Sequence, residues 1–380
     1  TVRKTVGDKP SALQLILPEV YLSESGTRVP AIARDMETYC RDVLLSHPDS
    51  MIYLERTQSD GKIRRGLVGM VDLETYDFSR ASVSLIRATE GTVLERIPPR
   101  CAVRRGAALE TPHIMLLIDD PEATVIESLA KRAGDFSPAY DFDLMQGGGH
   151  VTGKWVPQAL FEEVNGALGA LITPEAMQKK YGSGALAPLL FAVGDGNHSL
   201  ATAKTCYEEI KAQIGEKALS HPARYALCEV VNLHDPSLEF EPIYRVVYGV
   251  DAERLLADFS AYVQGLGGTA AAQTFTAVVG TEQKEIVTKT PRFQLPVATL
   301  QAFLDEWLPI HPGASVDYIH GEDTLCRLAA REGAVGFLFC GMKKEQLFGS
   351  VMRDGPLPRK TFSMGHARDK RYCLDCRKIR

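Results

Sequence analysis

A short apolar run, a polar turn and a helix follow one another at residues 189–204, LLFAVGDGNHSLATAK. Residues 189–193 are apolar throughout, which predicts a buried strand. Asp195, Asn197 and Ser199 are residue types that cap helix N-termini, and the following segment has the composition of a helix. We therefore expect a helix to begin within a residue or two of His198.

The remaining pattern predicts an α+β protein with mixed sheets and flanking helices. Residues 50–73 contain two strand-like runs joined by a Ser-Asp-Gly turn, which indicates a hairpin. From about residue 121 amphipathic helices alternate with strands. We expect three parts: a β-rich part at 1–120, an α/β part carrying the polar turn at 121–250, and an α/β part with a basic tail at 251–380.

Composition narrows the functional classes. The chain has 380 residues, 45% hydrophobic and 24% charged, with a net charge of −5. This charge argues against nucleic acid as a partner, because proteins that neutralise many phosphates carry excess Lys and Arg. The chain has no apolar run of the roughly 20 residues that a membrane span needs, so a cytoplasmic location is expected. Of eight cysteines only Cys373 and Cys376 form a CxxC pair, and we interpret them as ordinary reduced thiols.

The turn itself has the chemistry of an anion site. Gly194 and Gly196 permit positive φ angles and close approach of a ligand to the backbone. A helix N-terminus beside them offers free N–H groups and partial positive charge. The alternative is that Asp195 and Asn197 only cap the helix. The spacing matches neither a P-loop nor a GxGxxG fingerprint.

Several long motifs carry a family resemblance: VGDGNHSLATAK, SLIRATEGTVLERIPP, YDFDLMQGGGH and VVNLHDPSLEFEPIYRVV. With them the chain resembles the domain-of-unknown-function family numbered 1015, in its longer firmicute-type branch, from about residue 12 onward.

The family's usual turn, Asp-Gly-His-His-Arg, is similar to the phosphate-binding motif of the ParB and sulfiredoxin-like superfamily, which includes archaeal free-serine kinases. This implies a ParB/sulfiredoxin-like core with additional α/β elaboration, nucleotide phosphates at the turn, and carboxylates that handle a metal or a substrate hydroxyl. Asp195 and His198 match the motif. Asn197 replaces the first His and Ser199 replaces the Arg, so a basic group from elsewhere must complete the site.

We expect that basic group to be Arg87 or Arg245 rather than the C-terminal cluster of Arg359, Lys360, His366 and Arg368. Glu90 lies where the family has a Glu, and it suits proton transfer or metal binding. The candidate catalytic residues are therefore Glu90, Asp195 and His198. The candidate metal ligands are Asp195 and Asp235. The candidate ligand-binding residues are Arg87, His150, Gly194, Gly196, Asn197, Ser199, Asn232 and Arg245.

These residues favour a phosphate- or nucleotide-binding enzyme, a small-molecule kinase that uses Mg²⁺ and ATP or ADP and acts on a hydroxyl-bearing metabolite such as an amino acid. The partner is then a small molecule, and self-association stays open. Two alternatives remain: a non-catalytic nucleotide-binding regulatory module, and a metal-dependent hydrolase that uses Glu90, His234 and Asp235. We expect Glu90, Asp195, His198 and Asn232 to converge on one pocket.

Overall fold

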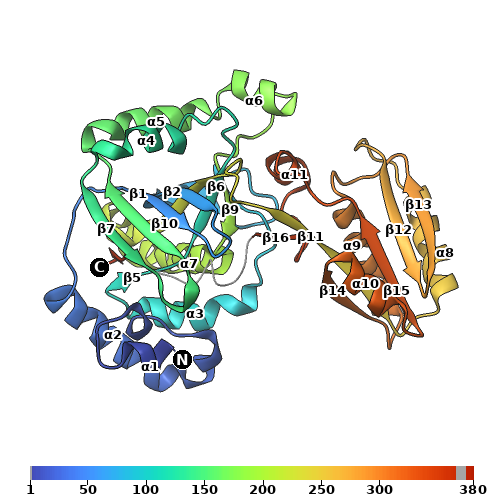
Figure 1. The fold of residues 1–380 in the computed structure, drawn as a ribbon, viewed down its shortest axis with the longest axis horizontal. Coiled ribbons are helices and arrows are strands. Elements are labelled where there is room, and N and C mark those ends of the chain that lie inside the picture. The colour runs from blue at the N-terminus through green and yellow to red at the C-terminus, as the bar shows by residue number, and fades with distance from the viewer. Residues whose placement is uncertain (1, 365–373) are drawn as a thin grey trace. The chain divides into compact units, whose positions relative to one another are not determined.

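The chain folds into two compact units in a computed structural model that describes residues 2–364 and 374–380 (Figure 1). Unit 1 holds the chain up to Leu238 together with residues 374–380, and unit 2 holds the described residues from Glu239 onward. The expected boundary at 120/121 lies inside unit 1, and that at 250/251 lies inside unit 2. His366, Arg368 and Cys373 lie outside the described residues.

A nine-stranded mixed sheet forms the centre of unit 1, which confirms the predicted α+β class. Strands β4 and β9 run parallel to each other, as do β6 and β10, whereas β9 and β6 are antiparallel. The carboxyl ends of β4 and β9 therefore lie at one end of the sheet, here named the Asp195 end. Those of β6 and β10 lie at the other, the Asn232 end. The strand order is β3 (Tyr76–Asp77), β4 (Ile86–Ala88), β9 (Phe191–Asp195), β6 (Met115–Ile118), β10 (Tyr225–Asn232), β2 (Ile63–Asp72), β1 (Ile52–Thr57), β8 (His150–Trp155) and β7 (Pro138–Asp143).

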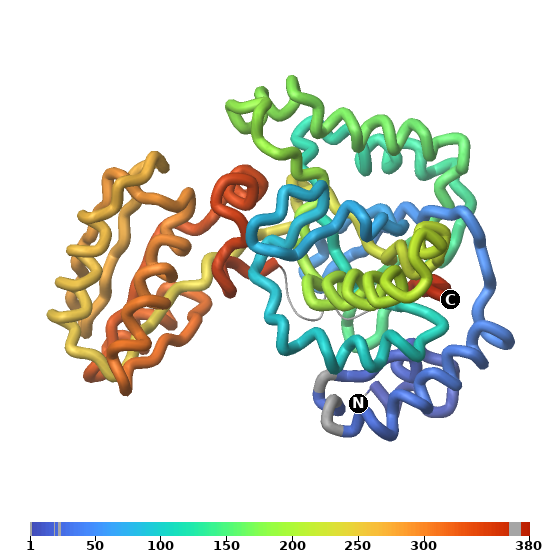
Figure 2. Tube along the Cα trace, turned by 180° about the vertical axis from the view of Figure 1, so that it is seen from behind, coloured from blue at the N-terminus to red at the C-terminus, as the bar shows by residue number. Residues whose placement is uncertain are grey.

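Helices of unit 1 pack on this sheet through apolar stripes. Leu200, Ala203 and Tyr207 of α7 are spaced by three and four residues and are fully buried in the main core. Helix α3 packs against α7 (Figure 2). None of the helices in the described part of the chain is long and apolar enough to cross a membrane. The helices are α1 (Val2–Val6), α2 (Ser25–Asp42), α3 (Ile97–Arg105), α4 (Ile126–Arg132), α5 (Phe161–Ala170), α6 (Pro174–Tyr181) and α7 (Asn197–Ile214).

The last residues of the chain belong to unit 1. Strand β17 (Arg377–Lys378) pairs with β5 (Leu109–Glu110), a short strand that follows α3. Ile379 is buried with Leu15, Met36 and Leu109 in a small second core. The C-terminus therefore packs beside α2 and α3.

Unit 2 is a separate α/β layer built around clustered aromatic rings. Phe259 lies at the centre and contacts the rings of Phe275, Phe303 and Phe337, with centroids 5.0–5.4 Å away. Its sheet has the order β13 (Glu282–Thr288), β12 (Gln273–Val279), β15 (Ala334–Phe339), β11 (Phe240–Tyr248) and β14 (Ser315–His320), with β16 (Phe362–Met364) also paired to β11. Its helices are α8 (Ala252–Gln264), α9 (Pro296–Trp307), α10 (Glu322–Ala329) and α11 (Gln346–Asp354).

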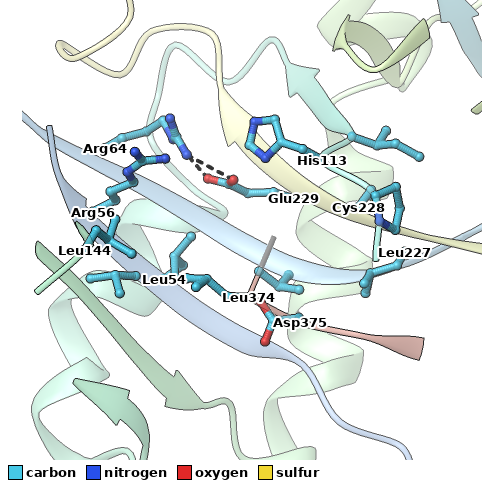
Figure 3. Close-up of a pocket in the computed structure, with 14 residues that line it drawn as sticks. Leu54, Arg56, Arg64, His113, Leu144, Leu227, Cys228, Glu229, Leu374 and Asp375 are labelled. Atoms are coloured by element: carbon cyan, nitrogen blue, oxygen red, sulfur yellow. Dashed lines mark hydrogen bonds and ion pairs between the residues drawn. The ribbon is translucent and has the colours of Figure 1, made fainter. Parts of the chain in front are cut away.

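A buried ion pair links β2 and β10 in unit 1. Arg64 donates to both carboxylate oxygens of Glu229, at 3.0 and 3.1 Å, beside a cavity of about 40 Å³ (Figure 3). Both side chains are buried. Burial alone would raise the pKa of Glu229, but the charge and hydrogen bonds of Arg64, together with neighbouring positive charge, outweigh it and hold the pKa below its ordinary value. The pair is therefore ionised at neutral pH.

Replacing one partner of this pair should destabilise unit 1 strongly. Glu229→Gln leaves a buried guanidinium without its counter-charge, which we expect to lower the free energy of unfolding by about 3–5 kcal/mol. The control is Glu55→Gln on neighbouring β1, whose half-exposed pair with Arg65 has an N–O distance of 3.4 Å and should be worth no more than about 1 kcal/mol. Urea unfolding measures both. If both variants lost the same free energy of unfolding, the buried pair would contribute no more to stability than the exposed one.

Candidate functional site

The predicted strand, turn and helix are confirmed. Strand β9 ends at Asp195 and α7 begins at Asn197, one residue before His198. Gly194 lies within β9, and Gly196 between the two elements has a φ of 82°. The first helical hydrogen bond runs from Leu200 N–H to the Gly196 carbonyl, at 3.0 Å. The N–H groups of Asn197 and Ser199 therefore precede the helical ladder and are available to a ligand.

Gly196 also makes the closest backbone approach of the turn. A Cβ at this position would lie 2.7 Å from the carbonyl oxygen of His113 and 2.9 Å from the Cα of Ile114. Both contacts are too short for any side chain. Only glycine therefore brings the start of α7 against the segment that leads into β6.

The loop that carries Glu90 lies beside this turn. It follows β4, which pairs with β9, and Thr89 Oγ1 donates to the Val193 carbonyl at 2.7 Å. Two residues past Gly91, the Val93 N–H donates to Nε2 of His198 at 3.3 Å. The structure thus brings the segments of Glu90, Asp195 and His198 together at the Asp195 end of the sheet.

Asn232 lies at the opposite end of the sheet. Strand β6 pairs Met115 with Asp195 at its start and Ile118 with Asn232 at its finish, about 10 Å further along at 3.3 Å per residue. The Asn232 amide donates to the Asp120 carbonyl and to Glu127, both at 2.9 Å. The structure therefore does not bring Asn232 to the turn, because β6 runs antiparallel to β9.

His234 and Asp235 share that distant position. His234 Nε2 lies 2.7 Å from Asp119 Oδ1, and the Asp235 carboxylate accepts from the N–H groups of Arg65 and Ser237. Asp235 is thus separated from Asp195, and the pair proposed as metal ligands is not assembled. The same separation removes the geometry of a hydrolase that would combine these residues with Glu90.

The two expected arginines have other partners. Arg87 donates to the backbone carbonyls of Ser84, Ala187 and Pro188, at 2.6–2.8 Å. Arg245 lies in unit 2, where its fully buried guanidinium donates to the carbonyls of Ile243, Arg359 and Lys360 and to Gln301. The sequence predicted neither arrangement, because no pattern of neighbouring residues distinguishes an arginine that donates to buried carbonyls from one that binds a ligand.

His150 lies on β8, which is separated from β9 by β6, β10, β2 and β1. Its two ring nitrogens lie 2.7 Å from Asp143 and Asp141 of the adjacent strand. These hydrogen bonds raise the pKa of His150 above its ordinary value. The glycine run before it forms the β7–β8 connection.

A pocket of about 310 Å³ opens beside the first turn of α7. We name it the Ser199 pocket, because Ser199 is the predicted residue that lines it. The pocket is also lined by Thr202 of α7, by Arg100 and Arg104 of α3, and by residues 111–114. Its apolar wall comes from Leu15, Leu17 and Met36.

Two buried polar atoms of residues that line this pocket have no hydrogen-bond partner within the described residues: Nη2 of Arg104 and Oγ1 of Thr111. Nε2 of His113 is also buried without a partner there, but its ring lies at the smaller cavity beside Arg64 and Glu229 (Figure 3). Burial lowers the pKa of His113, so its ring is neutral at pH 7. Unpaired buried polar atoms are costly and rare in folded proteins. The two at the Ser199 pocket therefore indicate that a polar ligand completes it.

Neither the pattern nor the motifs identified Arg104, Thr111 or His113. Arg104 falls in the sequence RCAVRR, whose charges resemble an ordinary exposed helix face. Across residues 2–364 and 374–380, no group of three or more His, Cys, Asp or Glu side chains is placed to hold a metal ion. The expected Mg²⁺ stays a prediction.

The chain belongs to the family described as "Protein of unknown function (DUF1015)", whose model matches residues 1–307. No match was found among curated proteins.

Solved structures that are similar include a mutant free serine kinase in complex with ADP, with a TM-score of 0.42, 10% identity, and 84% of this chain and 92% of that chain covered. A conserved hypothetical protein from Pyrococcus furiosus has a TM-score of 0.38, 9% identity and coverage of 82% and 94%. SbnI with C-terminal truncation from Staphylococcus aureus has a TM-score of 0.37, 10% identity and coverage of 79% and 83%. Because these TM-scores lie below 0.5, the likeness assigns neither fold nor ligand to this chain.

Gly196 should tolerate substitution worse than Gly182, a glycine of positive φ with open space beside it. Gly196→Ala introduces both the positive-φ strain, about 1–2 kcal/mol, and the clash with His113 and Ile114. Gly182, at the end of α6, has a φ of 69° and no atom within 4 Å of the place that a Cβ would take, so Gly182→Ala introduces the strain alone. We expect Gly196→Ala to lose clearly more free energy of unfolding in urea denaturation. A loss equal to that of Gly182→Ala would contradict the close approach.

Proposed function

We propose that this protein binds the phosphate groups of a nucleotide at the first turn of α7 and transfers a phosphoryl group to the hydroxyl of a small molecule. The observation that carries the proposal is the helix start that adjoins the Ser199 pocket. The N–H groups of Asn197 and Ser199 and the partial positive charge of an 18-residue helix suit an anion there. The unpartnered, buried Thr111 hydroxyl in the same pocket supports a polar ligand.

The size and walls of the pocket suit a nucleotide. Its volume of about 310 Å³ lies at the lower end of the range of about 300–1,000 Å³ found for small-molecule sites. Leu15, Leu17 and Met36 give it an apolar lining that suits a base, whereas Arg100 and Arg104 offer positive charge for phosphates. Ligand sites typically combine an apolar lining with a few polar groups in this way.

Phosphoryl transfer requires mainly positioning and neutralisation of negative charge. Glu90, beside the turn, is the candidate base for the acceptor hydroxyl, and His198 holds the 90–93 loop through Val93. Mg²⁺ usually binds through one or two carboxylates and the substrate phosphates. Asp195 in the turn and Glu90 in the adjoining loop would supply such carboxylates. An amino acid with a side-chain hydroxyl would be an acceptor of suitable chemistry.

Placing a negative charge at Ser199 should abolish anion binding without unfolding the protein. An Asp in the first turn of a helix favours the helix, but it repels phosphate in the pocket. We expect Ser199→Asp to lose the thermal stabilisation by ADP, which for the parent at 100 times its Kd is about 2.7 kcal/mol. Ser199→Ala, which removes the hydroxyl but adds no charge, should keep most of it. Thermal-shift titrations compare the three proteins. Full stabilisation of Ser199→Asp would exclude an anion at this helix start.

Catalysis is tested by turnover rather than binding. ATP and Mg²⁺ incubated with a panel of hydroxyl-bearing amino acids should give ADP and a phosphorylated acceptor, measured by mass spectrometry. Glu90→Gln should reduce kcat by about 10²–10⁴-fold, because it removes the general base, while ADP binding is retained. Nucleotide binding with no turnover of any acceptor would instead favour the regulatory-module alternative.

A further inference from the structure

We propose that Arg104, together with Thr111, forms a second anchor in the Ser199 pocket that binds a negatively charged group of the ligand. This inference rests on the proposed function, because the anchor lines the same pocket as the start of α7. Arg104 would supply the guanidinium that the turn lacks at Ser199. The anchor is assembled from α3 and the segment before β6, far from the turn in sequence.

A carboxylate fixes the Arg104 side chain in place. Its Nη1 donates to Oε2 of Glu110 at 2.6 Å, and its side chain is 13% exposed. The other terminal nitrogen, Nη2, is buried and has no partner within the described residues. Nη1 is therefore held by the protein, and Nη2 is left for a ligand. A planar, preorganised donor of this kind suits phosphate or carboxylate oxygens.

Glu110 is shared between two arginines. Its Oε1 accepts from the Leu227 N–H at 2.8 Å and from Arg377 Nε at 2.7 Å. Arg377 also donates to the carbonyls of Pro222 and Tyr225, so each of its guanidinium nitrogens has a partner. One buried carboxylate thus faces two guanidinium groups, which leaves a positive excess at Arg104. A ligand anion would balance this charge.

Thr111 extends the anchor along the pocket wall. It is 7% exposed, and its unpartnered hydroxyl can both donate and accept. A phosphate or carboxylate bound to Arg104 would accept from this hydroxyl as well. The ligand is therefore an anion held at two places, by α7 and by Arg104.

Arg105 offers a matched control for Arg104. It is the next residue on α3, but its guanidinium forms an exposed pair with Glu209 at 2.8 Å and 2.7 Å. Arg104→Gln and Arg105→Gln therefore remove the same charge from the same helix, and only the first removes a pocket donor. Thr111→Val is a second probe, because it deletes the unpaired hydroxyl at nearly constant volume.

Isothermal titration with ADP, and with adenosine as a probe that lacks phosphates, tests the anchor. Arg104→Gln should weaken ADP binding by about tenfold or more, since a hydrogen bond to a charged group is lost, while adenosine binding is unchanged. Arg105→Gln should stay within about twofold of the parent for both probes. Thr111→Val should raise the Tm of the free protein, because it removes an unsatisfied buried hydroxyl, and yet weaken ADP binding. A merely structural role would lower the Tm.

The outcomes separate the anchor from the proposed function. If ADP binds Arg104→Gln and Thr111→Val as tightly as it binds Arg105→Gln, whereas Ser199→Asp does not bind it, the nucleotide site stands and the anchor is overturned. If Arg104→Gln does not fold, an unchanged ADP affinity of Thr111→Val overturns the anchor by itself. If the parent binds neither ADP nor inorganic phosphate, the proposed function and the anchor are both overturned.

Discussion

The close approach of Gly196 to the backbone of His113 and Ile114 determines where helix α7 can begin. With a Cβ–oxygen distance of 2.7 Å, no side chain fits between the turn and the segment that enters β6. This contact places the first residues of α7 next to His113 and Ile114. Because α3 packs on α7 and leads directly into that segment, the same contact brings Arg100 and Arg104 to the pocket. The site therefore depends on one glycine.

The pocket has two kinds of group that could neutralise a bound anion. Backbone N–H groups at a helix start carry partial charge and need no side chain. A guanidinium held by Glu110 carries a full charge, and the C-terminal Arg377 shares that carboxylate. The motif that the turn resembles has an arginine at the position of Ser199; in the site that we propose, the charge comes from α3 instead. An arginine at either position would neutralise a phosphate in the same way.

Local features of the site could be predicted from the sequence, whereas its long-range partners could not. The apolar run, the cap-type residues and the glycines define β9, the turn and α7, because each acts over a few residues. Asn232 and Asp235 were expected at the turn, but strand direction decides at which end of the sheet a loop lies, and β6 is antiparallel to β9. Arg87 and Arg104 look alike in sequence. Arg87 donates to backbone carbonyls. Arg104 donates to one carboxylate, and its Nη2 has no acceptor within the described residues.

Backbone amide NMR of the full chain during a phosphate titration tests the central claim most directly. If phosphate binds at the start of α7, the ¹⁵N–¹H resonances of Asn197, His198 and Ser199 should shift with a common saturating curve. The amide of Gly182, at the end of α6, should not move. Shifts that saturate elsewhere in the protein while these three amides stay unchanged would contradict the account.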